Sequence, residues 1–165
     1  MTFSTREYQK RQSPIKDAEF CEWAARCRDQ ADSFTKIVAY CLEDPCRTFV
    51  GEPSIFANAA FACELYLKAL LFRERKECRG HDLFSLFNEL SPEIQNLIKE
   101  KHSCGNVARM CFEQEILKIS QTFEKFRYYH ESNGSVRGLN AQFLTELLLV
   151  LKGLTRGNPR IGLRN

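Results

Sequence analysis

The sequence lacks the short motifs that mark most enzyme classes. It contains no Gly-rich phosphate loop, no G-x-S-x-G, no H-E-x-x-H and no EF-hand loop. Nothing therefore predicts a P-loop enzyme, a serine hydrolase of that type, a zinc protease or a calcium sensor. Strand-like alternation of useful length and repeats at a fixed period are also missing, which excludes sheet folds and solenoids.

Eight cysteines are present, but they lack the spacing of a metal site. The nearest approach to a paired motif is Cys41-x4-Cys46, which has no second pair to complete four ligands. The three histidines and the scattered acids add no ligand set, so the sequence predicts neither a metal nor another cofactor. Several cysteines fall on apolar helix lines, where Cys acts as a small hydrophobe, and we expect reduced thiols.

The sequence also shows no pattern typical of a secretory leader or of a membrane span. The opening residues, MTFSTREYQKRQ, contain no apolar stretch of the kind that a signal peptide carries. No apolar run reaches the roughly 20 residues of a membrane span without interruption by Glu64 and Lys68. These features predict a cytoplasmic protein without membrane attachment.

Charge is modest overall but uneven along the chain. The net charge of +3 is too small to indicate nucleic-acid binding by itself. Bases concentrate in RERKECR (73–79), and the chain from residue 152 onward has no acid but contains Lys152, Arg156, Arg160 and Arg164. The simplest interpretation is a solvated helix end and tail, and the alternative is a weak RNA or DNA footprint.

Apolar residues recur at helical spacing along most of the chain, which predicts an all-α fold. The expected architecture is an up-down bundle of four long helices with one or two short inserted helices. It forms a single domain over 13–155, between a polar arm (1–12) and a basic tail (156–165). The predicted helices cover 13–42, 54–76, 82–90, a short stretch from Ser91, 108–131 and 140–154, with breakers Pro45, Gly51 and Pro53 before the second.

Two charged residues interrupt the most apolar predicted helix. In FACELYLKALL, residues 61–71, only Glu64 and Lys68 are charged, and they lie four apart on one face. A surface ion pair is the simplest interpretation, but a helix that is apolar on most sides places at least one of the charges in a partly buried position. A buried charge needs a partner, so we expect a polar cluster that is either structural or faces a ligand.

Two later stretches could complete such a cluster. In GHDLFSLFNEL, His81 and Asp82 precede a short helix, and the simplest interpretation is that one of them is its N-cap. In FEKFRYYHESNG, His130 continues the buried line of a helix, and Arg127 and Tyr128 lie beside it. A cation, phenols and an imidazole close together near a loop suit contact with a phosphate or a base.

Taken in order, AAFACELYLKALL, GHDLFSLFNEL and FEKFRYYHE resemble the HEPN family (higher eukaryotes and prokaryotes nucleotide-binding domain). The family carries an acid followed four residues later by Lys, then an HDL that begins the next helix, then an RY near the end of a later helix. The resemblance covers about residues 26–154 and implies an all-α bundle, often dimeric. The matching positions are Glu64, Lys68, His81, Asp82, Leu83, Arg127 and Tyr128.

The late RYY stretch looks closer to the family branch with RYP than to the ribonuclease branch with R-x4-6-H. Arg127 and His130 are only three apart, and Tyr129 stands where the Pro would be. Arg75 and His81 fit R-x5-H by letter, but they occur earlier than the family motif. The sequence therefore favours a domain without catalysis of its own.

The leading hypothesis is a domain that binds a nucleotide or RNA, or docks a partner such as a nucleotidyltransferase or an antitoxin. The resemblance implies a homodimer in a defence or toxin–antitoxin context, with Lys68 and Arg127 on phosphate and Glu64 holding Arg127. The alternative is a metal-independent endoribonuclease. In it His130 or His81 would act as acid/base, and Arg127 or Arg75 would stabilise the transition state. A third interpretation is a purely structural salt-bridge cluster.

Overall fold

The computed structural model describes residues 17–102, 109–120 and 140–157, and within these ranges it contains helices and loops but no strand. The expected all-α fold is confirmed for this part of the chain. Its helices are, in order, α2 (Asp17–Leu42), α3 (Pro45–Arg73), α4 (Leu83–Glu89), α5 (Pro92–Lys101), α6 (Arg109–Ile119) and α8 (Ala141–Arg156).

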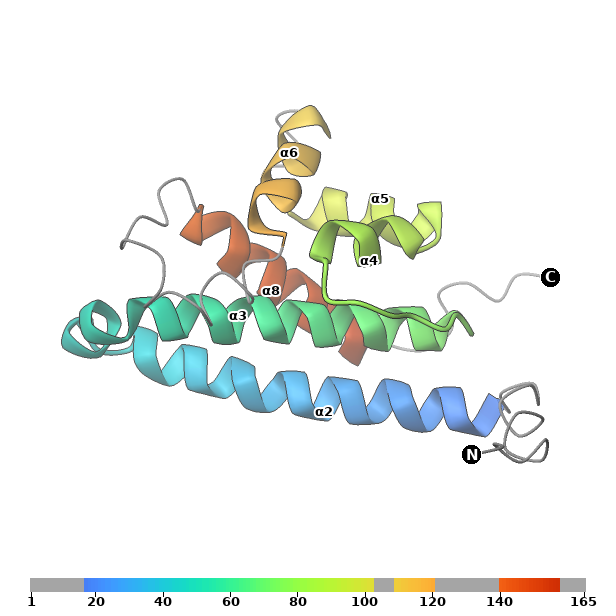
Figure 1. Cartoon of the computed structure of the whole chain (residues 1–165), viewed down its shortest axis with the longest axis horizontal. Helices are drawn as coiled ribbons and strands as arrows, with labels where there is room; N and C mark the ends of the chain where they lie inside the picture. The colour runs from blue at the N-terminus through green and yellow to red at the C-terminus, as the bar shows by residue number, and fades with distance from the viewer. Residues whose placement is uncertain (1–16, 103–108, 121–139, 158–165) are drawn as a thin grey trace, which may run out of the picture.

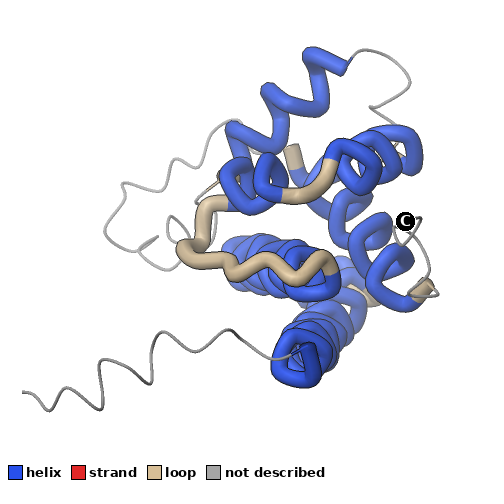
Figure 2. Tube along the Cα trace, turned by 90° about the vertical axis from the view of Figure 1, so that its right-hand side faces the viewer, coloured by secondary structure: helices blue, strands red, loops and turns tan. Residues whose placement is uncertain are grey.

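Helix α3 is the central element. It has 29 residues and lies antiparallel to α2, which has 26, along the length of the molecule (Figure 1). Helix α8 packs against both of them, and α4, α5 and α6 lie on the far side of α3 from α2 (Figure 2). Helix α3 is therefore contacted from several sides.

The apolar character of α3 follows from that position. Its segment Pro53–Arg73 is long and apolar enough to cross a membrane by length and composition, but 67% of the most apolar window is buried inside the protein. Side chains on several of its faces are fully buried, among them Ala62, Cys63, Tyr66, Leu67 and Leu71. A helix contacted from several sides needs apolar residues around most of its circumference.

The neighbouring helices bury the lines that their spacing predicts. Helix α2 buries Phe20, Ala24, Ala31 and Val38, and the other members of its predicted line are partly buried. Helix α6 buries Phe112, Ile116 and Ile119, and α8 buries its Leu-rich face: Phe143, Leu144, Leu147, Leu148, Leu151 and Leu154. Each helix thus contributes one apolar face to a common core.

The predicted break over residues 43–54 is wrong, because α3 begins at Pro45. Asp44 caps this start by accepting a hydrogen bond from the backbone N–H of Cys46 at 2.8 Å. Proline is favoured in the first helical turn, where its missing N–H would have had no partner. Pro53 lies inside the helix, and burial of the residues that follow outweighs the one backbone hydrogen bond that it removes.

The chain reverses direction where α3 ends. The N–H of Lys76 donates to the carbonyl of Leu71 at 3.0 Å, and the N–H of Arg75 donates to that of Phe72 at 3.1 Å. This is a Schellman ending, with Arg75 at φ 62 in the left-handed conformation that glycine normally supplies. The following loop then runs back along α3 to α4, so the residues before α4 lie beside the middle of α3 (Figure 1).

Charged residues of this loop hold the short helices in place. Lys76 Nζ donates to the carbonyl of Glu89 at 2.7 Å, at the end of α4. Ser91 is the N-cap residue of α5, as predicted, but its side chain makes no capping hydrogen bond. Instead the Glu74 carboxylate accepts from the Ser91 N–H at 3.0 Å. The loop is therefore a fixed part of the fold.

Candidate functional site

Glu64 lies almost wholly buried in the middle of α3, with 1% of its surface exposed. Its Oε1 accepts a hydrogen bond from Lys68 Nζ at 2.7 Å and lies 2.9 Å from His81 Nδ1. Lys68 is one turn further along the same helix, and His81 is brought there by the returning loop. Three of the residues that the sequence predicts as a cluster are thus in direct contact. We call them the Glu64 cluster.

The second oxygen of Glu64 is not satisfied. Oε2 is buried, and among the residues that the structure describes it is the one buried side-chain nitrogen or oxygen atom without a hydrogen-bond partner. An unpaired acceptor of this kind costs about 1–3 kcal/mol, and more when it is charged. Such atoms are rare in folded proteins and call for a specific explanation.

The cluster opens towards the surface through His81. The exposed fraction of the side chain rises from 2% for Glu64 to 17% for Lys68 and 57% for His81. An ionised Glu64 can only accept, so the Nδ1 of His81 carries the proton and its Nε2 is the acceptor of the neutral ring. An exposed imidazole edge is therefore fixed by a buried carboxylate.

Asp82 is an N-cap, which confirms the simplest interpretation of its position. One carboxylate oxygen accepts from the Ser85 N–H at 2.7 Å, and the other accepts from the hydroxyl of Ser120. Burial alone would raise the pKa of Asp82, but the hydrogen bonds from Ser120 and Ser85 outweigh it and hold the pKa below its usual value. Asp82 therefore anchors the loop that places His81.

Two thiols lie within the electrostatic reach of the Glu64 cluster. Burial raises the pKa of Cys27 and raises that of Cys78 to about 11, although the charge of Lys68 acts in the opposite direction. Both thiols remain protonated at neutral pH and are poor nucleophiles. Within the described ranges no three His, Cys, Asp or Glu side chains form a group that could hold a metal ion.

The remaining predicted residues are three late in the chain and Arg75. Arg127, Tyr128 and His130 lie outside the described residues, so their proposed contacts stay predictions. Arg75 is bound to the start of α2, where its Nε lies 2.8 Å from Asp17 Oδ1. The R-x5-H pair of Arg75 and His81 therefore has separate partners.

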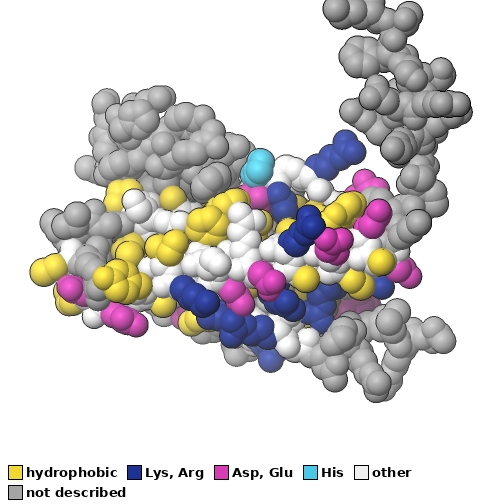
Figure 3. All heavy atoms as spheres, turned by 90° about the horizontal axis from the view of Figure 1, so that it is seen from below, with side chains coloured by type: hydrophobic (Ala, Val, Ile, Leu, Met, Phe, Trp, Pro, Cys, Tyr) yellow, Lys and Arg dark blue, Asp and Glu magenta, His cyan; other side chains and the backbone are white. Residues whose placement is uncertain are grey.

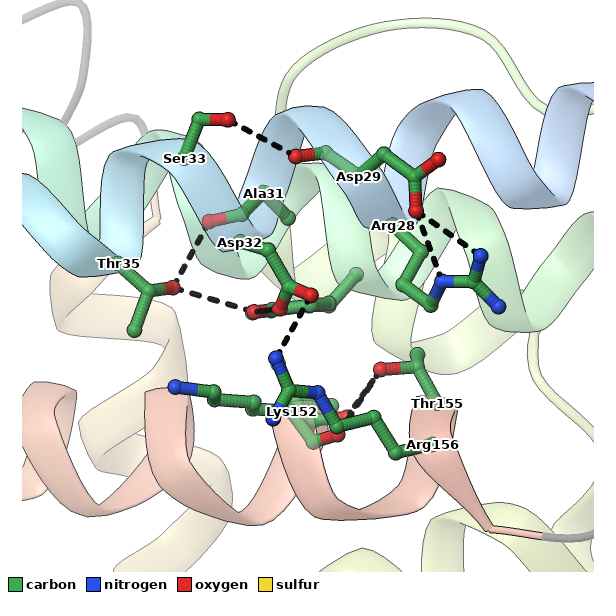
Figure 4. Close-up of polar contacts among 11 residues, drawn as sticks. Arg28, Asp29, Ala31, Asp32, Ser33, Thr35, Lys152, Thr155 and Arg156 are labelled. Carbon is green, nitrogen blue, oxygen red and sulfur yellow. Dashed lines mark hydrogen bonds and ion pairs between the residues drawn. The ribbon is translucent and has the colours of Figure 1, made fainter.

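Sequence reasoning missed a second polar cluster, which joins α2, α3 and α8 (Figure 4). The buried hydroxyl of Tyr66 donates to Asp32 Oδ1 at 2.5 Å and lies 3.2 Å from Thr35 Oγ1. Arg156 donates to Asp32 Oδ2 at 2.8 Å. The available signal was the phenol itself, because a buried Tyr hydroxyl needs a partner. We call these four residues the Asp32 cluster.

The protonation states of the Asp32 cluster are fixed by its contacts. Burial alone would raise the pKa of Asp32, but hydrogen bonds from Arg156 and Tyr66 and the charge of Lys152 lower it. Burial and the neighbouring Asp32 raise the pKa of Tyr66 well above its usual value. Tyr66 is therefore a permanent donor and Asp32 a permanent acceptor near neutral pH.

His102, at the end of α5, is a buried histidine that the sequence did not single out. It is 1% exposed, its Nε2 lies 3.1 Å from the carbonyl oxygen of Phe143, and its ring packs on Phe112 and Phe143. These contacts join α5, α6 and α8 in the core. His102 is therefore a packing residue rather than part of a surface site.

Comparison with known proteins does not assign the chain to a family. No protein-family model matches it, and neither the curated proteins nor the solved structures contain a significant match. The HEPN resemblance accordingly stays a prediction. What is established is a helical protein whose central helix carries one complete polar cluster and one incomplete one.

Proposed function

We propose that the chain is an HEPN-like domain that binds a nucleotide or RNA at the Glu64 cluster. One observation carries this proposal: a buried carboxylate holds Lys68 and an exposed His81 while its second oxygen remains unpaired. A purely structural cluster would be expected to satisfy every buried oxygen. In a cluster that binds a ligand, the unpaired oxygen is explained because the ligand can donate a hydrogen bond to it.

The chemistry of the cluster suits a phosphate-bearing ligand with hydroxyl or amino groups. Lys68 supplies a cation and His81 a ring edge that donates when protonated. Glu64 cancels the charge of Lys68, so phosphate binding requires a further cation, and the sequence predicts Arg127 for this role. The unpaired Glu64 oxygen accepts from a donor, such as a ribose hydroxyl, a base amino group or the Arg127 guanidinium.

The proposal includes the rest of the predicted architecture. The helix predicted over 108–131 is wrong in length, because α6 (Arg109–Ile119) ends before Ser120, which lies in a turn. A fourth long member of an up-down bundle with α2, α3 and α8 therefore stays a prediction. A homodimer, or a complex with a nucleotidyltransferase or an antitoxin, would bring a second surface to the site. Size-exclusion chromatography with light scattering measures the oligomeric state directly.

Binding measurements on full-length variants test the function. Adenosine 5′-monophosphate is titrated by calorimetry, and a fluorescein-labelled oligouridylate by fluorescence polarisation. We expect His81→Ala and Glu64→Gln to weaken the binding of both probes about tenfold, as expected for loss of a charge-assisted hydrogen bond. Arg127→Ala should weaken binding at least as much.

Arg79→Ala is the matched control for His81→Ala, because Arg79 is an exposed base in the same loop. Its affinity for both probes should stay close to that of the wild type. Equal losses in Arg79→Ala and His81→Ala would mean that only net charge matters. Unchanged binding in folded His81→Ala and Glu64→Gln proteins would refute the proposed site.

The contact between Glu64 and His81 also favours a second candidate function, a metal-independent endoribonuclease. A carboxylate on Nδ1 orients the ring, so Nε2 can take the proton of a ribose 2′-hydroxyl. The O2′–P bond then forms as the P–O5′ bond breaks, and O5′ takes a proton from water. Because Glu64 cancels the charge of Lys68, the cation that stabilises the charge on phosphate would be the predicted Arg127.

RNA cleavage distinguishes this candidate from simple binding. The expected products are fragments with 2′,3′-cyclic phosphate and 5′-hydroxyl ends, formed in the presence of a chelator and lost in His81→Ala. Intact RNA after incubation with a protein that binds it would refute the ribonuclease and leave the binding function standing.

A further inference from the structure

A second basic feature lies away from the Glu64 cluster, where α2 and α8 pack together. Arg28 on α2 and Lys152 and Arg156 on α8 form what we call the basic strip, and their side chains lie on the same side of the two helices (Figure 4). Viewed from below, the surface carries Lys and Arg side chains with Asp and Glu side chains among them (Figure 3).

The strip carries a local excess of positive charge. Its neighbours are Arg73, Asp29 and Asp32, which gives four bases against two acids and a net local charge of +2. The side chains of Arg28 and Arg156 are 40% and 54% exposed, and Lys152 has no ion-pair partner among the described residues. All three cations can therefore reach a ligand.

The Asp32 cluster holds the Arg156 side chain in position. Asp32 binds Arg156 at 2.8 Å and is itself held by the buried Tyr66 hydroxyl at 2.5 Å. One contact to Asp32 occupies only part of a guanidinium that has five N–H donors. A cation whose side chain is already ordered loses less conformational entropy when it binds an anion.

The C-terminal end of α8, close to the strip, is also favourable for an anion. The carbonyl groups at a helix C-terminus lack partners and repel negative charge. Here Arg73 donates to the carbonyls of Leu154 at 3.1 Å, Thr155 at 3.3 Å and Gly157 at 3.2 Å. The guanidinium of Arg73 thus neutralises a helix end that would otherwise repel a phosphate.

The strip and the Glu64 cluster face different sides of α3. Glu64 and Tyr66 are two residues apart, about 200° around a helix with 3.6 residues per turn. The first contacts the loop before α4, and the second contacts α2. The strip is therefore a separate surface and does not rest on the function proposed for the Glu64 cluster.

We propose that the basic strip binds the phosphate backbone of single-stranded RNA. Lys152 and Arg156 lie one helical turn apart, about 6 Å along the axis, so they can contact successive phosphates. Planar guanidinium groups suit bidentate contact with phosphate oxygens. Contacts to the backbone confer affinity without base specificity, and the binding depends strongly on salt.

Salt titration of RNA binding tests this assignment. The affinity of full-length protein for a fluorescein-labelled oligouridylate is measured by fluorescence polarisation at several potassium chloride concentrations. Each lost phosphate contact makes the negative slope of log K against log salt shallower by about 0.7 for a single strand. The Lys152→Gln, Arg156→Gln double variant should bind at least tenfold more weakly at low salt, with a slope shallower by about 1.4.

Two further variants make the test specific. Lys101→Gln with Lys118→Gln removes the same charge from α5 and α6, and its slope should match that of the wild type. Tyr66→Phe keeps every charge but releases Asp32, so it should weaken RNA binding with little change in slope. Adenosine 5′-monophosphate binding should be unchanged in the strip variants and weakened in His81→Ala, which separates the two surfaces.

Several results would overturn the assignment. The first is a wild-type protein that does not bind the oligouridylate at low salt. The second is an unchanged slope in the folded Lys152→Gln, Arg156→Gln variant, or an equal loss in the control pair. The third is binding of polyglutamate as tight as that of RNA, which would assign the strip to an acidic protein instead.

Discussion

Helix α3 takes part in two carboxylate-centred clusters that differ in completeness. In the Asp32 cluster each carboxylate oxygen has its own donor, Tyr66 on one and Arg156 on the other. In the Glu64 cluster both partners, Lys68 and His81, share one oxygen and the other is buried without a partner. The first cluster joins three helices, whereas the second joins α3 to a loop.

The difference suggests different roles for chemically similar groups. A complete network of charged hydrogen bonds stabilises the packing of the elements that it joins, at about 1.5–3 kcal/mol for each such bond. An incomplete one loses part of that gain and is retained for another reason, such as a ligand. Mutations that separate stability from binding can test this division.

The largest effect on stability is expected from Lys68→Met. It leaves the buried Glu64 carboxylate with His81 alone, and breaking a buried pair costs about 3 kcal/mol. The Glu64→Leu, Lys68→Met double variant removes both charges and should restore or exceed the wild-type free energy of unfolding, measured by urea denaturation. Lys99→Met is the matched control in the same measurement, since Lys99 is similarly buried and is paired with Glu113 at 2.7 Å.

A double variant as unstable as Lys68→Met would break the comparison. It would mean that the Glu64 cluster stabilises the fold despite its unpaired oxygen, as the structural interpretation of the sequence requires.

Asp32→Ala should lower the free energy of unfolding by about 2 kcal/mol. The change removes the hydrogen bond from the buried Tyr66 hydroxyl, which accounts for most of the loss, and the bond from the exposed Arg156, which contributes little. Asp29→Ala serves as its control, because Asp29 is an exposed neighbour whose partner Arg28 is adjacent in sequence, and it should cost less than about 0.5 kcal/mol. An equal loss of the free energy of unfolding in the two variants would contradict a structural role of the Asp32 cluster.

Tyr66→Phe tests the contribution of the Asp32 cluster to stability with a smaller change. It keeps the buried ring and removes only the hydroxyl, so the expected loss is about 1 kcal/mol. Tyr40→Phe on the exposed face of α2 should change the free energy of unfolding by less than about 0.5 kcal/mol. A Tyr66→Phe protein as stable as the wild type would show that Asp32 finds another donor.

Acid should weaken the anchoring contacts of Asp32 and Asp82. The pKa values of Asp32 and Asp82 are below the ordinary value of 3.8, so the stability that they contribute is present above that pH. It is lost as the pH falls through the lowered values. Urea denaturation at pH values from about 5 to 2.5 should show a shallower decline in Asp32→Asn and Asp82→Asn than in the wild type, and an identical decline would contradict the assignment.

The sequence predicts the features of this protein that depend on short-range geometry. Apolar spacing identifies the buried faces of α2, α6 and α8, and the spacing of Glu64 and Lys68 places both charges on one face of α3. Asp82 before an apolar run predicts the cap that it forms. These relations span at most one or two helical turns, so they are readable without tertiary structure.

The features that were missed depend on packing between distant elements. Asp32 and Arg156 are 124 residues apart, and nothing local marks them as partners. The start of α3 differs from its prediction because proline, which the prediction treats as a break, is also favourable in the first turn of a helix, where Pro45 lies. The carbonyl contacts of Arg73 also required the position of α8.

The loop that returns along α3 has a consequence for the order of folding. Every residue of the Glu64 cluster lies between positions 64 and 81, so its contacts close a short segment of chain. Contacts of low sequence separation form at small entropic cost, and the α2–α3 pair can form before α8 is synthesised. We therefore expect the Glu64 cluster to assemble early on the nascent chain, while the Asp32 cluster closes only when the last described helix docks.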